Sequence, residues 1–157
     1  MSDVAEAFVL RPGRRDETAA LFAIWEAAVA ASHDFVTPAD LAMYARLVRE
    51  NYLPRAKPRV AAAADGRPVG FIGVAQGTIE ALFVDPSWAG RGCGRALVAD
   101  ALAGIAAPRR LRVDVNEQNE GARAFYARLG FKLIGRSRLD ACGRPYPILH
   151  LEHPGAR

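Results

Sequence analysis

Three glycines, Gly90, Gly92 and Gly94, stand at every second position of one short stretch, and Arg91 and Arg95 alternate with them. Glycines allow neighbouring backbone N–H groups to turn toward one point. The N-terminus of a following helix adds N–H donors and a partial positive charge. The two arginines place full positive charges beside these donors. The spacing therefore predicts a binding site for a phosphate or pyrophosphate group.

A strand and a helix must hold this glycine loop in place. The apolar run from Ile79 to Val84 is rich in branched and aromatic residues, which is typical of a buried strand. Asp85-Pro86 ends the strand, because proline cannot donate to a ladder. The segment from Ala96 to Leu102 then has helical composition with an apolar stripe. Strand, loop and helix start follow in the order that an anion-binding loop requires.

The remaining periodicities predict a mixed α/β sheet of about seven strands with four helices. A hairpin turns at Asp65-Gly66, and the helix between two later strands makes those strands parallel. The expected strands are Phe8–Arg11, Arg59–Ala64, Val69–Val74, Ile79–Val84, Leu111–Val115, Phe131–Gly135 and Ile148–Glu152. The expected helices are Ala19–Ala31, one that begins at Pro38 after the cap Thr37, one that contains Ala96–Leu102, and Glu120–Leu129 with Asn119 as its cap.

Length and composition exclude several classes of protein. The chain has 157 residues, 51% of them hydrophobic, and a net charge of +4. This size predicts a single domain over residues 1–157. No apolar run approaches the ~20 residues that cross a bilayer, and the first residues lack the layout of a signal peptide, so we expect a cytoplasmic protein without a membrane partner. The basic residues are scattered, which disfavours nucleic-acid binding, and the two cysteines and three histidines show no metal-ligand spacing.

Three blocks of residues, taken together, resemble one known family. They are Val84-Asp85-Pro86, the run from Gly90 to Leu97, and the set Asn119, Ala122, Phe125-Tyr126 and Gly130-Phe131. In this order they are similar to the GCN5-related N-acetyltransferase (GNAT) superfamily over roughly residues 8 to 152. Three further segments resemble its small bacterial YjaB-like branch: His33-Asp34-Phe35, Asn116-Glu117-Gln118-Asn119 and Gly143-Arg144-Pro145-Tyr146-Pro147.

The resemblance implies the GNAT acyl-CoA N-acyltransferase fold and transfer of an acetyl group from acetyl-CoA to a primary amine. The acceptor would be a protein lysine, a protein N-terminus or a small-molecule amine, and the protein a monomer or homodimer. A strand backbone would pair with the pantetheine arm, and the loop amides would take the pyrophosphate. The implied coenzyme A contacts are Leu82, Phe83, Val84, Arg91, Gly92, Cys93, Gly94, Arg95, Ala96, Asn119 and Tyr126. Ala89 departs from the pattern, because the family usually has Gln or Arg there.

Acetyl transfer needs a group that takes a proton from the amine and one that protonates the departing thiolate. A lysine amine has an ordinary pKa of ~10.4. Glu80, within an apolar strand, is one candidate base, and Asp114, on the next strand, is the alternative. Tyr126 shares a helical face with Asn119 and Ala122, and a phenol pKa of ~10 lies near that of a thiol, which favours it as the acid. The competing interpretations are a solvent-facing carboxylate and a core tyrosine.

The acceptor pocket and two other functional classes complete the predictions. His33, Phe35, Asn116 and Tyr146 are expected to contact the acceptor, and Cys93 is expected to fill space in the loop. A nucleotide-binding oxidoreductase is disfavoured, because its fingerprint needs a third glycine where Arg95 or Leu97 stands. The other alternative is a non-catalytic acyl-CoA-binding or sensor module on the same fold. Ala89 favours this alternative, and the Glu80–Tyr126 pair favours an enzyme.

Overall fold

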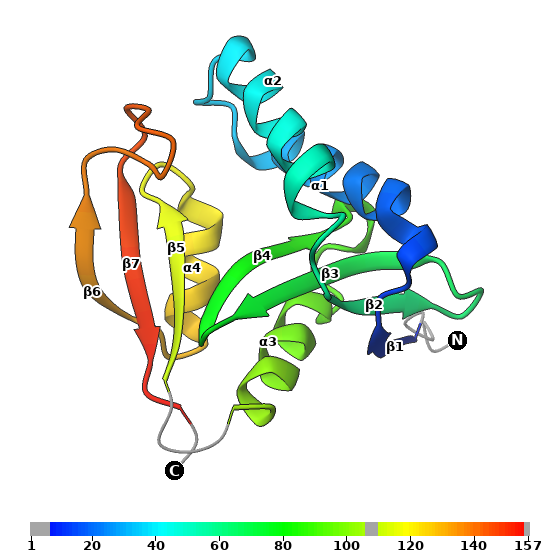
Figure 1. Cartoon of the computed structure of the whole chain (residues 1–157). Coiled ribbons are helices and arrows are strands. Elements are labelled where there is room, and N and C mark those ends of the chain that lie inside the picture. The colour runs from blue at the N-terminus through cyan, green and yellow to red at the C-terminus, as the bar shows by residue number, and fades with distance from the viewer. Residues whose placement is uncertain (1–6, 106–109, 156–157) are drawn as a thin grey trace. The chain divides into compact units, whose positions relative to one another are not determined.

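The computed structural model describes residues 7–105 and 110–155. Over these residues it has the mixed α/β architecture that the sequence predicted, with strand order β1-β2-β3-β4-β5-β7-β6 (Figure 1). The strands are β1 (Phe8–Pro12), β2 (Arg59–Ala63), β3 (Pro68–Ala75), β4 (Thr78–Val84), β5 (Leu111–Asn116), β6 (Lys132–Ser137) and β7 (Ile148–His153). The α-helices are α1 (Thr18–Ser32), α2 (Pro38–Leu47), α3 (Cys93–Ala103) and α4 (Glu120–Arg128). Among the described residues, no helix combines the length and apolarity that a membrane span needs.

The chain divides into two compact units. The first consists of Met1–Gly73 and Ala81–Val98, and the second of Val74–Glu80 and Ala99–Arg157. The expectation that residues 1–157 form one domain stays a prediction.

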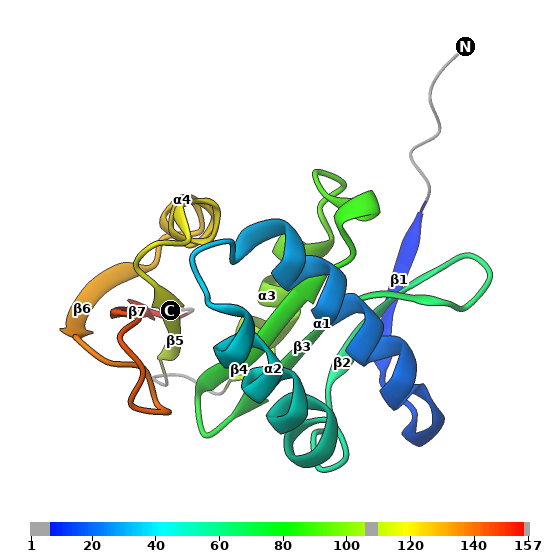
Figure 2. The same ribbon diagram turned by 90° about the horizontal axis from the view of Figure 1, so that it is seen from above.

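The first unit is a layered structure in which helices cover both faces of the strands. Helices α1 and α2 lie on one face of β2 and β3, and α3 lies on the other (Figures 1 and 2). Thr37 caps α2 by accepting a hydrogen bond from the N–H of Asp40 at 3.2 Å, as predicted. The buried residues of its core are Leu21, Ile24, Trp25, Val29, Leu53, Val60, Ala62, Phe71 and Ala81. Burial of these apolar side chains supplies the main stabilisation of the unit.

The second unit is a strand layer covered on one face by α4 (Figure 1). Strand β7 pairs antiparallel with β5 on one side and with β6 on the other. The start of β4 pairs with β5 in parallel, Thr78 with Arg112 and Ile79 with Val113, as predicted. Alternation along β5 buries Leu111, Val113 and Val115 and exposes the residues between them. One face of the layer is therefore core, and the opposite face is polar.

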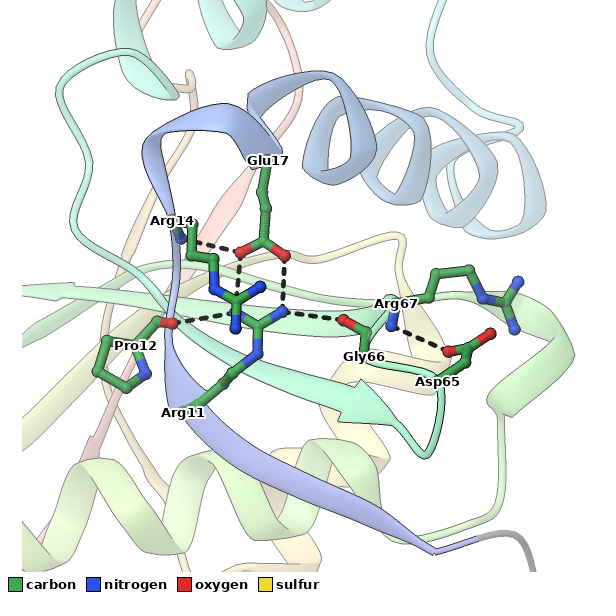
Figure 3. A network of polar contacts seen from close by, with 7 residues as sticks. All are labelled: Arg11, Pro12, Arg14, Glu17, Asp65, Gly66 and Arg67. Atoms are coloured by element: carbon green, nitrogen blue, oxygen red, sulfur yellow. Dashed lines mark hydrogen bonds and ion pairs between the residues drawn. The ribbon is translucent and has the colours of Figure 1, made fainter.

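An ion pair between Arg11 and Glu17 in the first unit connects β1 with the segment before α1 (Figure 3). Arg11 donates two hydrogen bonds to the Glu17 carboxylate, at 2.8 and 2.6 Å, and a third to the carbonyl of Gly66 at 3.0 Å. Glu17 also accepts from the N–H of Arg14 at 2.8 Å. Hydrogen bonding from Arg11 lowers the pKa of Glu17, against the opposing effect of burial. The pair joins the end of β1, the start of α1 and the β2–β3 turn.

We expect Glu17→Gln to lower the free energy of unfolding by about 1–3 kcal/mol at neutral pH, because it removes a charged acceptor from Arg11. A lowered carboxyl pKa stabilises the fold above the ordinary pKa of about 4.3, and this contribution is lost as the pH falls through the folded-state value. The difference in unfolding free energy between the variant and the wild type should therefore become smaller at acidic pH. Denaturant titrations at neutral and at acidic pH measure the unfolding free energy of both proteins. Glu26→Gln, on the exposed side of α1, is the control. Equal unfolding free energies at neutral pH would contradict the assigned role.

Candidate active site

The glycine loop, residues 85–92, connects β4 to α3 in the first unit. Gly90 and Gly92 have φ angles of 76° and 87°, in the left-handed region that L side chains rarely adopt. A Cβ at either position would meet no described atom within 4 Å. Glycine is therefore required here by backbone conformation and not by crowding. The loop has the turned backbone that the sequence predicted for an anion site.

Helix α3 begins directly after this loop. The carbonyl of Gly92 accepts the first helical hydrogen bond, from the N–H of Ala96 at 2.9 Å. The geometry of a helix leaves the N–H groups of its first turn, here Cys93 to Arg95, without intrahelical acceptors. The helix dipole adds partial positive charge at this end. The amides predicted to take a pyrophosphate thus follow one another from the end of the loop, at Arg91 and Gly92, into the first turn of α3.

Side-chain contacts stabilise the conformation of the glycine loop. Asp85 accepts hydrogen bonds from the N–H and Oγ of Ser87, at 2.9 and 2.8 Å, and so caps the short helical turn Pro86–Trp88. Trp88 is buried, and the guanidinium of Arg91 lies over its ring, 4.6 Å from the centroid. Because Arg91 is exposed and packed on an aromatic face, its charge is held at the loop. Ala89 is exposed.

Cys93 fills space, as predicted. The residue is 1% exposed, and Leu97 and Val98 of the same helix are also buried. Burial raises the pKa of the thiol, which disfavours the thiolate and hence nucleophilic chemistry.

The end of β4 leads into the loop in the first unit. Leu82, Phe83 and Val84 are half-buried, and the ring of Phe83 packs against that of Phe71, with centroids 5.8 Å apart. A Cβ at Gly70 would lie 3.2 Å from the carbonyl oxygen of Phe83, so glycine there permits close approach of the backbones. The predicted pairing of Leu82–Val84 with a pantetheine arm stays a prediction.

The second unit carries both candidate bases on one face. The parallel pairs Thr78–Arg112 and Ile79–Val113 are followed on each strand by an acidic residue, Glu80 on β4 and Asp114 on β5. Side chains alternate along strands, so Glu80 and Asp114 point away from the face that buries Ile79 and Val113. Both carboxylates are exposed. The two candidate bases thus lie on the same face, each one residue beyond the last parallel pair of β4 and β5.

Asp114 is part of a three-residue network that the sequence did not predict. His150 lies directly opposite it on β7 and donates from Nδ1 to Asp114 Oδ1 at 2.6 Å. The other ring nitrogen of His150, Nε2, is 2.7 Å from Oγ of Ser137 on β6. An ionised carboxylate only accepts hydrogen bonds, so in the neutral imidazole the ring proton lies on Nδ1 and Nε2 accepts from the Ser137 hydroxyl. The histidine is thereby held in one tautomer and one orientation.

The sequence offered only a weak signal for this network. Strand β7 alternates apolar and polar residues, and His150 is on its polar side. Its partners lie 36 and 13 residues away, and their identity depends on the register of three strands. That register includes an irregularity between Leu133 and Gly135, which local patterns do not reveal.

Helix α4 carries the candidate acid. Asn119 caps the helix through Oδ1, which accepts from the N–H of Ala122 at 3.1 Å, as predicted. Tyr126 is 5% exposed and contacts Phe125 and Phe131 edge to face, with centroid distances of 5.0 and 5.1 Å. Burial raises the pKa of Tyr126 well above the ordinary phenol value on which the sequence argument relied. Its hydroxyl is therefore protonated throughout the physiological range.

The expected acceptor residues form one pair in each unit. In the first unit, the ring of His33 contacts Ser32 Oγ through Nδ1 at 2.7 Å and packs on Phe35, with centroids 5.4 Å apart. Burial lowers the pKa of His33, which favours the neutral imidazole. In the second unit, Asn116 ends β5 opposite Ile148, and Tyr146 is buried two residues before Ile148. The structure thus brings Asn116 and Tyr146 to the same end of the strand layer.

Comparison with known proteins places this geometry in a family. Residues 26–142 match the model of the acetyltransferase (GNAT) domain. The peptidyl-lysine N-acetyltransferase YjaB of Escherichia coli is 44% identical over 147 residues, which cover 94% of this chain and 97% of the relative. The solution structure of apo-form YjaB from Escherichia coli has a TM-score of 0.87 at 41% identity, covering 96% of this chain and 99% of that one.

The fold also recurs at much lower sequence identity. The PaiA N-acetyltransferase of Thermoplasma acidophilum, solved in complex with coenzyme A, is similar with a TM-score of 0.71 at 17% identity. The match covers 94% of this chain and 99% of that protein. With the domain match and the extended identity to YjaB, the chain belongs to the GNAT family of acetyltransferases, in the branch of YjaB.

Proposed function

We propose that this acetyltransferase moves an acetyl group from acetyl-CoA to the side-chain amine of a lysine in a protein, by direct attack of the amine on the thioester. The observation that carries the proposal is the pair of left-handed glycines, Gly90 and Gly92, followed at once by the first turn of α3. This arrangement suits the pyrophosphate of coenzyme A. The name of the YjaB relative supports a peptidyl lysine as the acceptor.

The chain's own groups fit coenzyme A. In the proposal, the amides from Arg91 to Arg95, which lead into the first turn of α3, hold the pyrophosphate, and the backbone of Leu82–Val84 aligns the pantetheine arm. The exposed guanidiniums of Arg91 and Arg95 supply the charge that Ala89 does not. Oδ1 of Asn119 already accepts the hydrogen bond that caps α4. Asn119 would therefore contact the cofactor through its side-chain nitrogen, Nδ2.

The chemistry requires three groups of the protein. A backbone N–H of β4 near Phe83 would stabilise the negative charge that develops on the thioester oxygen. Tyr126 would donate its hydroxyl proton to the departing thiolate. The polar face that carries Glu80 and Asp114 would receive the proton that the amine loses. His33 with Phe35, and Asn116 with Tyr146, are the side chains proposed to contact the lysine substrate.

Calorimetry with acetyl-CoA, coenzyme A, NADH and ATP tests the cofactor assignment. We expect acetyl-CoA to bind, free coenzyme A to compete with it, and NADH and ATP to give no heat of association. Binding of NADH in place of acetyl-CoA, or no heat with any of them, would contradict the proposal. A monomeric or homodimeric state, a cytoplasmic location and the lack of a nucleic-acid partner stay predictions.

A further inference from the structure

The network of Asp114, His150 and Ser137 has a chemistry that the proposed reaction needs. Nitrogen Nε2 of His150 accepts from a hydroxyl, and Nδ1 is fixed by a carboxylate, both at distances below 2.8 Å. This is the arrangement of a hydroxyl, a base and a group that orients the base. The Asp114 side chain is 60% exposed and that of His150 is 33% exposed, so protons can exchange with solvent.

The backbone of β6 has an irregularity beside this network. Leu133 pairs with Leu151, but Gly135, and not the intervening Ile134, pairs with His150. The extra residue is a β-bulge, a feature common beside active sites because it redirects side chains. Gly135 lies against the imidazole, since a Cβ at this position would be 3.4 Å from the His150 ring, at ordinary van der Waals distance.

Neighbouring charges of the same face do not compete for His150. Glu152, the next residue on that side of β7, accepts hydrogen bonds from Arg110 and Arg112 at 2.8 and 2.7 Å. Glu80 follows the last parallel pair on β4 and is exposed. Asp114 is thus the carboxylate committed to His150.

We infer that His150 is the proton acceptor of the acetyl transfer, with Asp114 as its positioning residue and Ser137 as the hydroxyl that passes the proton. An imidazole suits this task better than a carboxylate, since its ordinary pKa of about 6.5 lies near neutral pH, whereas those of Asp and Glu lie near 4. The inference rests on the proposed function. It replaces both predicted bases: Asp114 acts through His150, and the Glu80 carboxylate attracts the lysine ammonium.

The step balances in protons and electron pairs. The bound lysine ammonium first releases one proton to solvent. The neutral amine nitrogen then forms a bond to the acetyl carbon as the carbon–sulfur bond breaks, and Tyr126 gives its proton to the thiolate. The amine passes a proton to Oγ of Ser137, whose own proton moves to Nε2 of His150. Asp114 stabilises the resulting imidazolium, which releases the proton to solvent, and Tyr126 regains one there.

Substitutions distinguish the role of His150 as the base from the role of the Glu80 carboxylate. We expect His150→Gln to lower kcat by about 10²-fold with unchanged KM for acetyl-CoA. Asp114→Asn should also lower kcat, because an amide donates to Nδ1 and forces the ring proton onto Nε2. Glu80→Gln should instead raise KM for a lysine peptide about two- to fivefold, which is the effect of losing one exposed charge pair.

Two further readouts exclude a merely structural role. Added imidazole should restore part of the rate of His150→Ala and leave that of Tyr126→Phe unchanged, and intact-protein mass should show no acetyl group on Ser137. A normal kcat in His150→Gln, a lack of rescue by imidazole, or an acetylated Ser137 would overturn the inference. Failure of the wild type to release coenzyme A would instead contradict the proposed function itself, and with it this inference.

Discussion

Tyr126→Phe is expected to lower kcat by about 10²-fold or more, while the KM for acetyl-CoA and the stability of the fold stay close to wild type. The change removes only the hydroxyl that protonates the departing thiolate, a contribution of the size typical for general acids. The ring itself stays packed between Phe125 and Phe131. Because burial raises the pKa of Tyr126, the wild-type hydroxyl should be protonated at every pH at which the enzyme is assayed. Release of free thiol from acetyl-CoA measures the rate.

The matched control is Tyr44→Phe, which removes a hydroxyl from a half-buried tyrosine of α2 that has no part in the proposed reaction. This variant should retain the wild-type kcat. If Tyr126→Phe also retained it at an unchanged unfolding midpoint, Tyr126 would have no role as the acid.

Gly92→Ala is expected to weaken acetyl-CoA binding by about tenfold. Left-handed backbone costs an L residue roughly 1–2 kcal/mol, and the wild-type φ at this position is 87°. The free loop of the variant can relieve that strain by rotating away from the left-handed region, which turns its amides from the pyrophosphate. Binding must then restore the strained conformation, so the affinity falls by about the strain energy. Calorimetric titration with acetyl-CoA measures the loss.

Gly66→Ala is a close control for this prediction. Gly66 lies in the β2–β3 turn with a φ of 88°, and a Cβ there would also meet no described atom within 4 Å. Gly66→Ala should bind acetyl-CoA as the wild type does, and only Gly92→Ala should lose affinity for acetyl-CoA. An equal acetyl-CoA affinity in the two variants would refute the assignment of the loop as the pyrophosphate site.

Features with a local chemical cause could be predicted from the sequence. Glycine spacing predicted the loop, and Thr37 and Asn119 were predicted as caps, because one side chain and the next turn of backbone decide each outcome. The parallel pairing of β4 with β5 followed from the helix between them. Three resembling blocks in the correct order predicted the family.

Features that depend on register and burial could not be predicted in this way. The Asp114–His150–Ser137 network requires the pairing of three strands and a bulge, so three separate polar residues gave no pattern in the sequence. The raised pKa of Tyr126 depends on how completely neighbouring elements bury its ring, and spacing along one helix does not determine that. The raised pKa of the Cys93 thiol likewise depends on burial, because desolvation outweighs the opposing effects of the Arg91 charge and a backbone hydrogen bond.

Mass spectrometry of the acceptor tests the central claim most directly. The full chain is incubated with acetyl-CoA and a panel of lysine peptides, N-terminal peptides and small amines, and each product is sequenced by fragmentation. We predict one added acetyl group on the lysine Nε, one coenzyme A thiol released per group transferred, and an enzyme of unchanged mass. A panel without any acetylated product, while acetyl-CoA stays intact, would contradict acetyl transfer to an amine by this protein.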